Sequence, residues 1–406
     1  MVNRCWILKA KGLSDLRLPV AAVILLGITQ IIGYGTLYYS FSILAPAIAR
    51  DFGHSTEWIF ALLSCALLAG GLAAPWIGKA FDLFGAGKVM CFGSVVASLA
   101  LIICSLSSGI GSFAICLLML EVAANLVQYG AAFALLVQLQ PAAATRSITY
   151  LTLIAGFAST LFWPFTSALH GWMTWQEIYR LFAVLNLAIC FPAHFWLAGQ
   201  LSRSRRQQNI SAGPRAEISG LLASDRRRQG FLLMAFALST QALLSSAILV
   251  HMVPLLTALG LGGIAVIAGS LFGPSQVASR LINMLFGRDL SPLALAIISA
   301  VLMAIAPVAL LLGAPSITSA IIFACIFGFG NGLFSITAGT LPLYLFGSAG
   351  YGALQGKVTS ARLVSSACAP FALAYLLANA GTTISLLLLG FWGLISVAAF
   401  LAIARR

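Results

Sequence analysis

Three polar side chains recur along one face of the apolar stretch 20–44. Gln30, Tyr34 and Tyr38 are spaced four residues apart, so they share one side of a helix. A polar face is costly against lipid, and we expect it to turn toward a bundle interior or a water-filled cavity. One amide and two phenols there could bind a polar, partly aromatic solute. The alternative is a helix-packing seam of hydrogen-bonded tyrosines.

A carboxyl group belongs to a second polar face, in the apolar stretch 112–138. Glu121, Asn125 and Gln128 follow one another at helical spacing, with Tyr129 beside them. A carboxylate deep in a membrane is costly, so Glu121 could take up and release protons near neutral pH. We predict a proton-coupling or substrate-contacting role for Glu121. The alternative is a structural carboxyl group that is hydrogen-bonded to a neighbouring helix.

Two shorter polar pairs occur in the second half of the chain. Gln241 and Ser245 are four residues apart, and so are Asn331 and Ser335, each pair within an apolar stretch. Each pair therefore lies on one helical face, as the polar residues of the first half do.

The composition is that of an integral membrane protein. Hydrophobic residues make up 61% of the chain and charged residues only 8%, and the mean hydropathy is +1.03. A soluble domain needs far more charge on its surface. Apolar stretches take up nearly the whole length, so no sizeable domain outside the membrane is expected.

Hydropathy and turn signals predict an all-α protein with twelve transmembrane helices in two six-helix halves. The expected divisions are an N-terminal tail (1–19), a first bundle (20–199), a basic linker (200–230) and a second bundle (231–404). The expected spans are 20–44, 57–77, 89–107, 112–138, 148–169, 178–198, 231–256, 264–286, 293–312, 318–345, 358–377 and 384–403.

The net charge of +13 does not indicate nucleic-acid binding, because the basic residues gather at alternate ends of the spans. This is the positive-inside pattern, and it places the tail, the linker and the C-terminus in the cytoplasm. We expect an integral protein of a bacterial inner membrane that contacts lipid and binds no nucleic acid. Attraction to anionic lipid headgroups is a minor alternative role for the basic residues.

The arrangement of six spans, a linker and six spans resembles the major facilitator superfamily. The loop 78–88 carries Gly78, Asp82, Gly85 and Lys88 at the positions of that family's signature, although three usual basic positions differ. Asp82 at a helix end can accept backbone N–H groups and pair with a basic residue of the other half. The resemblance thus implies a breakable cytoplasmic latch.

The corresponding place in the second half is a weaker copy of this signature. Asn283 stands where an aspartate is usual, and Arg280 precedes it inside the predicted span. A buried arginine needs a partner or water. We include Arg280 in the predicted latch.

The resemblance further implies that spans one, four, seven and ten line a central cavity, where substrate binds near the midplane. The predicted substrate-binding residues are therefore Gln30, Tyr34, Tyr38, Asn125, Gln128, Tyr129, Gln241, Ser245, Asn331 and Ser335.

We predict a secondary transporter that works by alternating access, with protons as a candidate coupling ion for symport. Apart from Arg280, the predicted cavity holds little fixed positive charge. This lining suits a neutral, polar, partly aromatic solute better than a polyanion, which needs a basic clamp. A vitamin-like compound such as riboflavin fits that description. We expect a monomer.

Export of drugs or of trivalent metalloids is the alternative within transport. Pro164 lacks the preceding glycine that is usual in drug–proton antiporters of the superfamily, and metalloid export requires Cys65, Cys104 and Cys116 to converge.

A non-transporting receptor on the same fold is a second alternative, although no output domain is evident. No nucleophile–base set, metal-ligand spacing or phosphate-binding glycine loop occurs, so we expect no enzyme, no metal and no cofactor.

Overall fold

The computed structural model describes residues 19–210, 217–287 and 289–405. The predicted tail therefore lies outside the described residues except for Pro19, and so does the middle of the predicted linker. Over the described ranges the chain consists of helices and turns, with one isolated β-bridge between Ser219 and Gly347.

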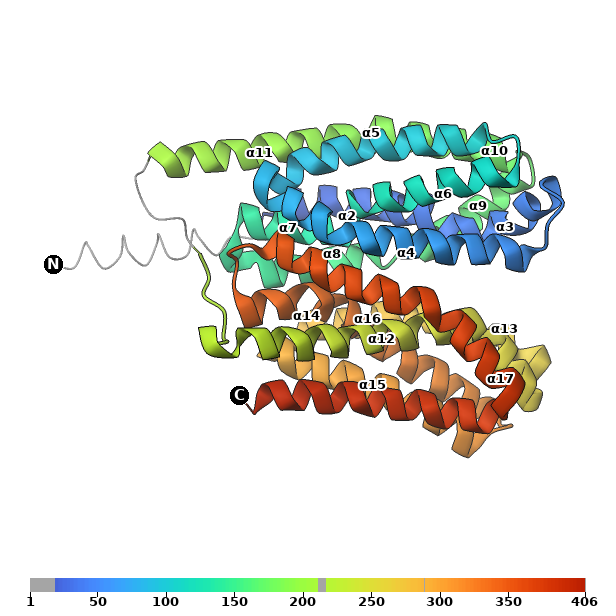
Figure 1. Cartoon of the computed structure of the whole chain (residues 1–406). Coiled ribbons are helices and arrows are strands. Elements are labelled where there is room, and N and C mark those ends of the chain that lie inside the picture. Colours follow the sequence, from blue (N-terminus) through green and yellow to red (C-terminus); the bar gives the residue numbers. More distant parts are fainter. Residues whose placement is uncertain (1–18, 211–216, 288, 406) are drawn as a thin grey trace.

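The first half consists of long helices interrupted by short π-helical or 3₁₀ turns and by loops (Figure 1). Its elements are α2 (Val20–Tyr34), η1 (Gly35–Tyr39), α3 (Ser40–Asp51), α4 (Thr56–Ala80), η2 (Phe81–Gly85), α5 (Ala86–Ser105), α6 (Ile110–Asn125), α7 (Tyr129–Leu139), η3 (Pro141–Ala143), α8 (Ala144–Ala155), α9 (Ala158–His170), α10 (Trp175–Leu185), η4 (Asn186–Cys190) and α11 (Phe191–Ile210).

The second half repeats this architecture with longer uninterrupted helices. Its elements are η5 (Ser224–Arg226), α12 (Arg227–Leu256), η6 (Thr257–Leu261), α13 (Gly262–Ser270), α14 (Phe272–Phe286), α15 (Pro292–Gly313), α16 (Ile317–Phe346) and α17 (Tyr351–Ala404).

Nine segments of the described chain are long and apolar enough to cross a membrane. Two of them, Thr56–Ser105 and Tyr351–Ala404, have 50 and 54 residues, whereas one crossing needs about 20 residues. Each contains a glycine with positive φ, Gly85 at 88° and Gly381 at 78°, where the chain reverses into a second arm (Figure 1). Together with the α13–α14 segment, these hairpins are consistent with the twelve predicted crossings.

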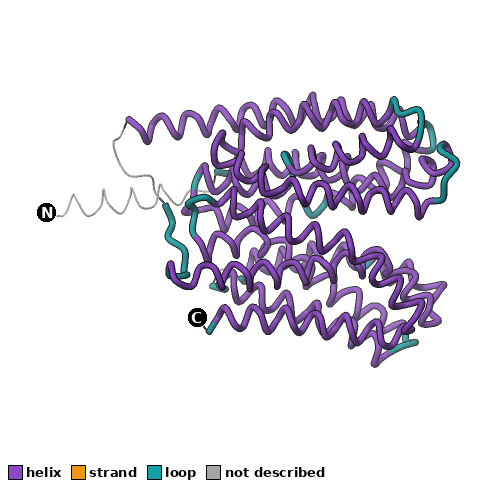
Figure 2. The backbone as a smooth tube through the Cα atoms, in the orientation of Figure 1, coloured by secondary structure: helices purple, strands orange, loops and turns teal. Residues whose placement is uncertain are grey.

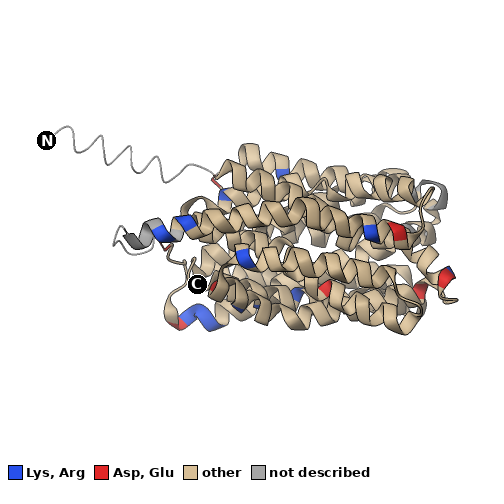
Figure 3. Cartoon of the chain, turned by 90° about the horizontal axis from the view of Figure 1, so that it is seen from above, with Lys and Arg blue, Asp and Glu red and all other residues tan. Residues whose placement is uncertain are grey.

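The two halves lie side by side with their helices running lengthwise (Figure 2). The described part of the linker and the C-terminus lie at the same end of the bundle, which we call the linker end (Figure 1). One large apolar core belongs to the second half, and two cores belong mainly to the first half. Charged side chains are sparse along the middle of the helices (Figure 3), as the cost of charge in hydrocarbon requires.

Candidate functional site

An aromatic cluster forms where the first and fourth predicted spans meet. The ring of Tyr34 lies 4.7 Å from that of Tyr129 and 6.3 Å from that of Tyr39. Tyr39 in turn packs against Trp163 at 5.8 Å and against Tyr38 at 5.3 Å. These five residues, which we call the aromatic cluster, include Tyr39 and Trp163, which the sequence analysis did not select.

A π-helical turn explains why Tyr39 joins Tyr34. The turn η1 covers Gly35–Tyr39, and its wider turn brings a residue five positions on closer to the starting face than an α-helix would. Tyr38, which we had placed on the face of Tyr34, is 41% exposed and contacts Tyr39 edge-on. Helical spacing alone therefore did not predict the contact between Tyr34 and Tyr39.

Gln30 binds the helix break that precedes Tyr129. Its Nε2 donates a 2.7 Å hydrogen bond to the carbonyl of Val127, in the break between α6 and α7. The amide thereby satisfies a backbone acceptor that the interrupted helix leaves free. Since Tyr129 is the first residue of α7, this bond helps to place its ring. The other amide atom of Gln30, Oε1, is buried without a partner among the described residues.

Arg280 enters the same region from the second half. The residue is 5% exposed, and its Nε donates to the Ser335 hydroxyl at 3.1 Å and to the Gly332 carbonyl at 3.3 Å. Its Nη2 donates to Oε1 of Gln276 at 3.2 Å. Arg280 also lies close enough to Tyr129 for the two to interact electrostatically.

The remaining terminal nitrogen of Arg280 crosses to the first half. Nη1 donates to the carbonyl of Thr152 at 3.1 Å, in the last turn of α8, where the helix dipole favours a cation. Gly156 makes this approach possible, because a Cβ there would overlap Nη1. The sequence analysis included Arg280 in the predicted latch; its hydrogen bonds join α14 to α16 and to α8 of the other half.

Arg362 is a second cation beside the aromatic cluster, and the sequence analysis missed it. Its guanidinium carbon lies 4.8 Å from the centre of the Phe334 ring, and it interacts electrostatically with Tyr34. Its Nε is buried without a hydrogen-bond partner in the described part of the chain. Because α17 already begins at Tyr351, Arg362 lies about 16 Å inside the helix rather than at its end.

Neither arginine is neutralised by a carboxylate. Among the described residues, the structure holds one ion pair within 4.0 Å, the exposed Arg226–Asp225 pair at 3.9 Å. Glu121 is 5% exposed, and its Oε1 has no hydrogen-bond partner there. Its electrostatic neighbours include Tyr38. The carboxyl group and Arg280 thus do not pair.

Two other predicted residues of span four lie at the break between α6 and α7. The Asn125 amide donates to the Glu121 carbonyl at 3.0 Å on its own helix, and Gln128 is the half-buried residue that precedes α7. Of the predicted residues in this span, Tyr129 lies within electrostatic range of Arg280 from the other half.

In the second half, the predicted residues divide into two groups. Ser245 donates to Oδ1 of Asn331 at 2.6 Å, which joins α12 to α16. Gln241 instead donates to the Ser299 hydroxyl at 2.9 Å and faces α15. Helical spacing defined a shared face for Gln241 and Ser245, but the neighbouring helices decide what each residue meets. The contacts of Gln241 favour a structural role.

Asp82 joins the halves at the linker end. Its two carboxylate oxygens accept hydrogen bonds from the backbone N–H groups of Gly352 at 2.9 Å and Ala353 at 2.7 Å. These groups belong to the first turn of α17, where the helix dipole favours an anion. Gly78 packs into the same helix, since a Cβ there would overlap the Gly352 carbonyl and lie 2.7 Å from Cα of Gly356.

The turn that carries Asp82 is held by Gln138, which the sequence analysis did not select. Gln138 accepts from the N–H of Ala86 at 2.9 Å and donates to the Phe81 carbonyl at 2.8 Å. Gly85 has φ 88°, a conformation that glycine adopts readily. Lys88 is exposed, and no ion pair involves it within the described ranges.

The thiol groups do not assemble into a three-cysteine site. Cys104 and Cys116 are buried and interact with each other, whereas Cys65 is exposed. The described residues contain no group of three or more His, Cys, Asp or Glu side chains that could hold a metal ion. This arrangement gives the metalloid alternative no support.

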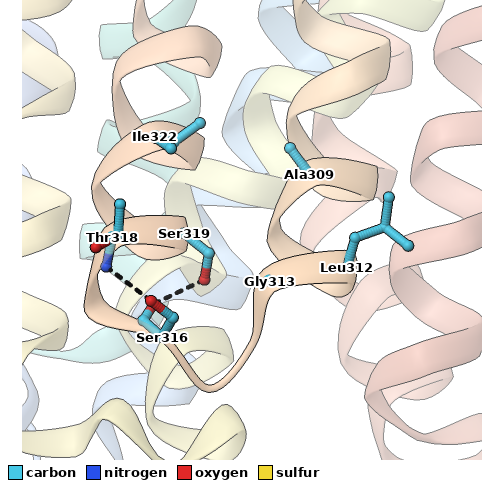
Figure 4. A pocket seen from close by; sticks show the side chains of 7 residues that line it. All are labelled: Ala309, Leu312, Gly313, Ser316, Thr318, Ser319 and Ile322. Atoms are coloured by element: carbon cyan, nitrogen blue, oxygen red, sulfur yellow. Dashed lines mark hydrogen bonds between the residues drawn. The ribbon is translucent and has the colours of Figure 1, made fainter.

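A separate cavity of about 360 Å³ lies at the turn between α15 and α16 (Figure 4). It is lined by Ala309, Leu312, Gly313, Ser316, Thr318, Ser319 and Ile322. None of the predicted site residues is among them, and the Ser316 and Ser319 hydroxyls bond to their own helix end.

A polytopic helical protein with two halves that meet at a polar, aromatic centre is a membrane transporter in architecture. Residues 26–370 match the model of the Major Facilitator Superfamily, and this chain belongs to that superfamily. Its members are transporters rather than enzymes.

Solved structures share the fold at low sequence identity. The crystal structure of the human organic anion transporter MFSD10 (TETRAN) matches 95% of this chain and 100% of its own, with a TM-score of 0.73 and 15% identity. The proton:xylose symporter XylE, bound to 6-bromo-6-deoxy-D-glucose, matches 93% of this chain and 94% of its own, with a TM-score of 0.68 and 14% identity. No curated protein matches the sequence.

Proposed function

We propose that this protein is a secondary transporter that moves a small, planar, polar organic solute across a bacterial inner membrane by alternating access. The observation that supports this most is the convergence of side chains from both halves on one region. Tyr34 and Tyr129 come from the first half, and Arg280 and Arg362 come from the second. A solute held between two halves that rock against each other requires such a shared site.

The contact at the linker end supplies a closed gate for this mechanism. The Asp82 carboxylate and the first turn of α17 hold the halves together there, and Gly78 lets the two backbones approach closely. In the proposed cycle, this contact breaks when the site opens toward the linker end. The alternate basic ends of the helices support a cytoplasmic location for that end.

The aromatic cluster suggests the shape of the solute. The ring of Tyr34 lies 4.7 Å from that of Tyr129 and 6.3 Å from that of Tyr39. These are separations of packed aromatic groups, and a planar ring would find the same kind of contact. Riboflavin stays a reasonable first compound to test on this ground. The expectation of a neutral solute rested on Arg280 as the main fixed cation, and Arg362 now weakens that premise.

Glu121 is the proposed proton-coupling group. The carboxyl group is buried, has no cationic partner within the described residues and has an oxygen without a hydrogen bond. An unpaired carboxyl group at this depth is available to exchange a proton, which supports the coupling role over the structural one.

Uptake of radiolabelled riboflavin into auxotrophic cells, with and without a protonophore, tests the proposal. Proton-coupled import predicts loss of uptake on protonophore addition and in Glu121→Gln, whereas Glu57→Gln, at an exposed helix start, should transport normally. Counterflow of riboflavin in proteoliposomes, repeated with matched aromatic acids and their amides, extends the test. Absence of flux for every compound, with a folded protein, would refute transport.

A further inference from the structure

We infer that the transported solute is an aromatic monoanion whose negative group binds Arg362 and Arg280 while its ring lies against Tyr34 and Tyr129. This inference rests on the proposed function and deepens it by naming the charge of the substrate. It replaces the neutral solute that the sequence analysis favoured.

Charge balance is the first argument. A guanidinium group removed from water is costly unless a counter-charge accompanies it, and Arg280 is buried while Arg362 is half-buried. Within the described ranges, neither Arg280 nor Arg362 has a carboxylate within 4.0 Å, and the buried Glu121 does not supply one. A neutral solute would leave both cations without a counter-ion in the membrane, whereas an anionic solute would supply one.

The contacts of Arg280 form the second argument. All its hydrogen bonds go to uncharged acceptors: two carbonyls, one hydroxyl and one amide oxygen. Hydrogen bonds between a guanidinium group and a carboxylate are shorter and stronger than those to neutral acceptors. A carboxylate near Arg280 would therefore compete with the Thr152 carbonyl, which belongs to the other half, and binding would be linked to the contact between the halves.

The geometry of Arg362 is the third argument. Its guanidinium group lies over the Phe334 ring at 4.8 Å, so one face is covered and the donors at the edge stay available for a planar anion. Its Nε has no protein partner in the described chain. Because Phe334 contacts Arg362 while the adjacent Ser335 accepts from Arg280, both cations meet the same turn of α16.

The surroundings favour one negative charge over several. Tyrosines lie within electrostatic range of both arginines, Tyr34 of Arg362 and Tyr129 of Arg280. Tyrosine supplies ring contacts and single hydroxyl groups, whereas a polyphosphate or dicarboxylate would need more donors. An aromatic carboxylate satisfies both the cations and the rings.

Matched acids and amides isolate the effect of charge at constant shape. The purified full-length protein is titrated calorimetrically with 4-hydroxybenzoate and 4-hydroxybenzamide, nicotinate and nicotinamide, and indole-3-acetate and indole-3-acetamide. At least one acid should bind about tenfold or more tightly than its amide, as charge-assisted hydrogen bonds require. Arg362→Gln should abolish this preference, and Arg362→Lys should keep part of it.

Arg146 provides the matched control. Its guanidinium group lies 5.8 Å from the Tyr150 ring, an arginine–aromatic contact on an exposed residue, so Arg146→Gln should retain the full preference for the acid. Size-exclusion profiles and melting curves of each variant establish that it is folded. Should Arg362→Gln fail to fold, Arg280→Lys is the second variant and should reduce the preference.

Three results would overturn the inference: equal affinity for acid and amide in every pair, no binding of any acid, or an acid preference that survives in folded Arg362→Gln and Arg280→Lys. Failure of the inference differs from failure of the proposed function. If amides or riboflavin show counterflow but acids do not, transport stands and the anionic substrate is wrong. If an acid binds but no compound shows flux, the site stands and transport is wrong.

Discussion

Nη1 of Arg280 donates a hydrogen bond to the carbonyl of Thr152 at 3.1 Å, and this bond joins the two halves of the transporter at its centre. The arginine belongs to α14 and the carbonyl to the last turn of α8. Both partners are buried, so the bond is shielded from water. Any rocking of one half against the other must stretch or replace it.

Gly156 offers a way to disturb this contact without changing the arginine. Gly156→Ala should reduce the initial transport rate by about tenfold or more, because its Cβ would displace the guanidinium group and weaken a charged hydrogen bond worth about 1.5–3 kcal/mol. The rate is measured by counterflow in proteoliposomes. Gly273→Ala, which adds a Cβ into open space, is the control and should transport normally. A normal rate in Gly156→Ala would contradict a role for this contact.

Close packing at the linker end predicts that a cysteine between the halves becomes more accessible to a labelling reagent when that packing is loosened. Gly78→Ala should force α4 and α17 apart, because the new Cβ would overlap the Gly352 carbonyl. A cysteine at Thr359, introduced after replacement of the eight native cysteines, should then react faster with a membrane-impermeant maleimide added at the linker end. Gly111→Ala, which meets nothing within 4 Å, should leave the labelling rate unchanged. Equal rates in all three proteins would show that Gly78 does not control the gate.

Asp82 should influence the transport cycle more than substrate binding. Asp82→Ala removes both acceptors of the Gly352 and Ala353 N–H groups, and each charged hydrogen bond stabilises the closed gate by about 1.5–3 kcal/mol. We expect a lower maximal rate with an affinity within about twofold of the native value, since the site lies elsewhere. Asp82→Asn keeps one acceptor and should be intermediate. A large loss of affinity with an unchanged rate would contradict this assignment.

Stability distinguishes the two interpretations of Glu121. If the carboxyl group were a structural hydrogen-bonding partner, Glu121→Gln would destabilise the protein by about 1–3 kcal/mol. Because Oε1 has no partner among the described residues, we expect an unchanged or raised melting temperature together with loss of proton-driven uptake. Differential scanning fluorimetry measures the first quantity. A marked fall in melting temperature would support the structural alternative.

The π-helical turn predicts that Tyr39 contributes more to the binding of the solute than Tyr38 does. Tyr39→Ala should weaken binding of the preferred acid by about three- to tenfold, because aromatic contacts contribute about 0.5–1.5 kcal/mol and Tyr39 packs against Tyr34. Tyr38→Ala should have a smaller effect, since Tyr38 is 41% exposed. Calorimetric titration of both variants measures the difference, and the reverse order would indicate that Tyr38 faces the solute.

The family and the general architecture could be predicted from the sequence because the bilayer acts as a uniform solvent. Each crossing needs a long apolar helix whose backbone hydrogen bonds are satisfied within it. This requirement can be recognised from the hydropathy of each segment alone. The loop with Gly78 and Asp82 was likewise recognisable, since its residues are close in sequence. Of the residues in the proposed site, Tyr34 and Tyr129 were predicted to bind substrate and Arg280 to belong to the latch, while Arg362 and Tyr39 were not selected.

What the sequence determined by itself was therefore which segments enter the membrane and which faces are polar. The tertiary structure decided which faces meet. The π turn at Gly35–Tyr39 aligned Tyr39 with Tyr34, and the packing of α14 against α8 carried Arg280 to Thr152. These outcomes depend on contacts between residues far apart in the chain, whereas helical periodicity specifies only the spacing along one helix.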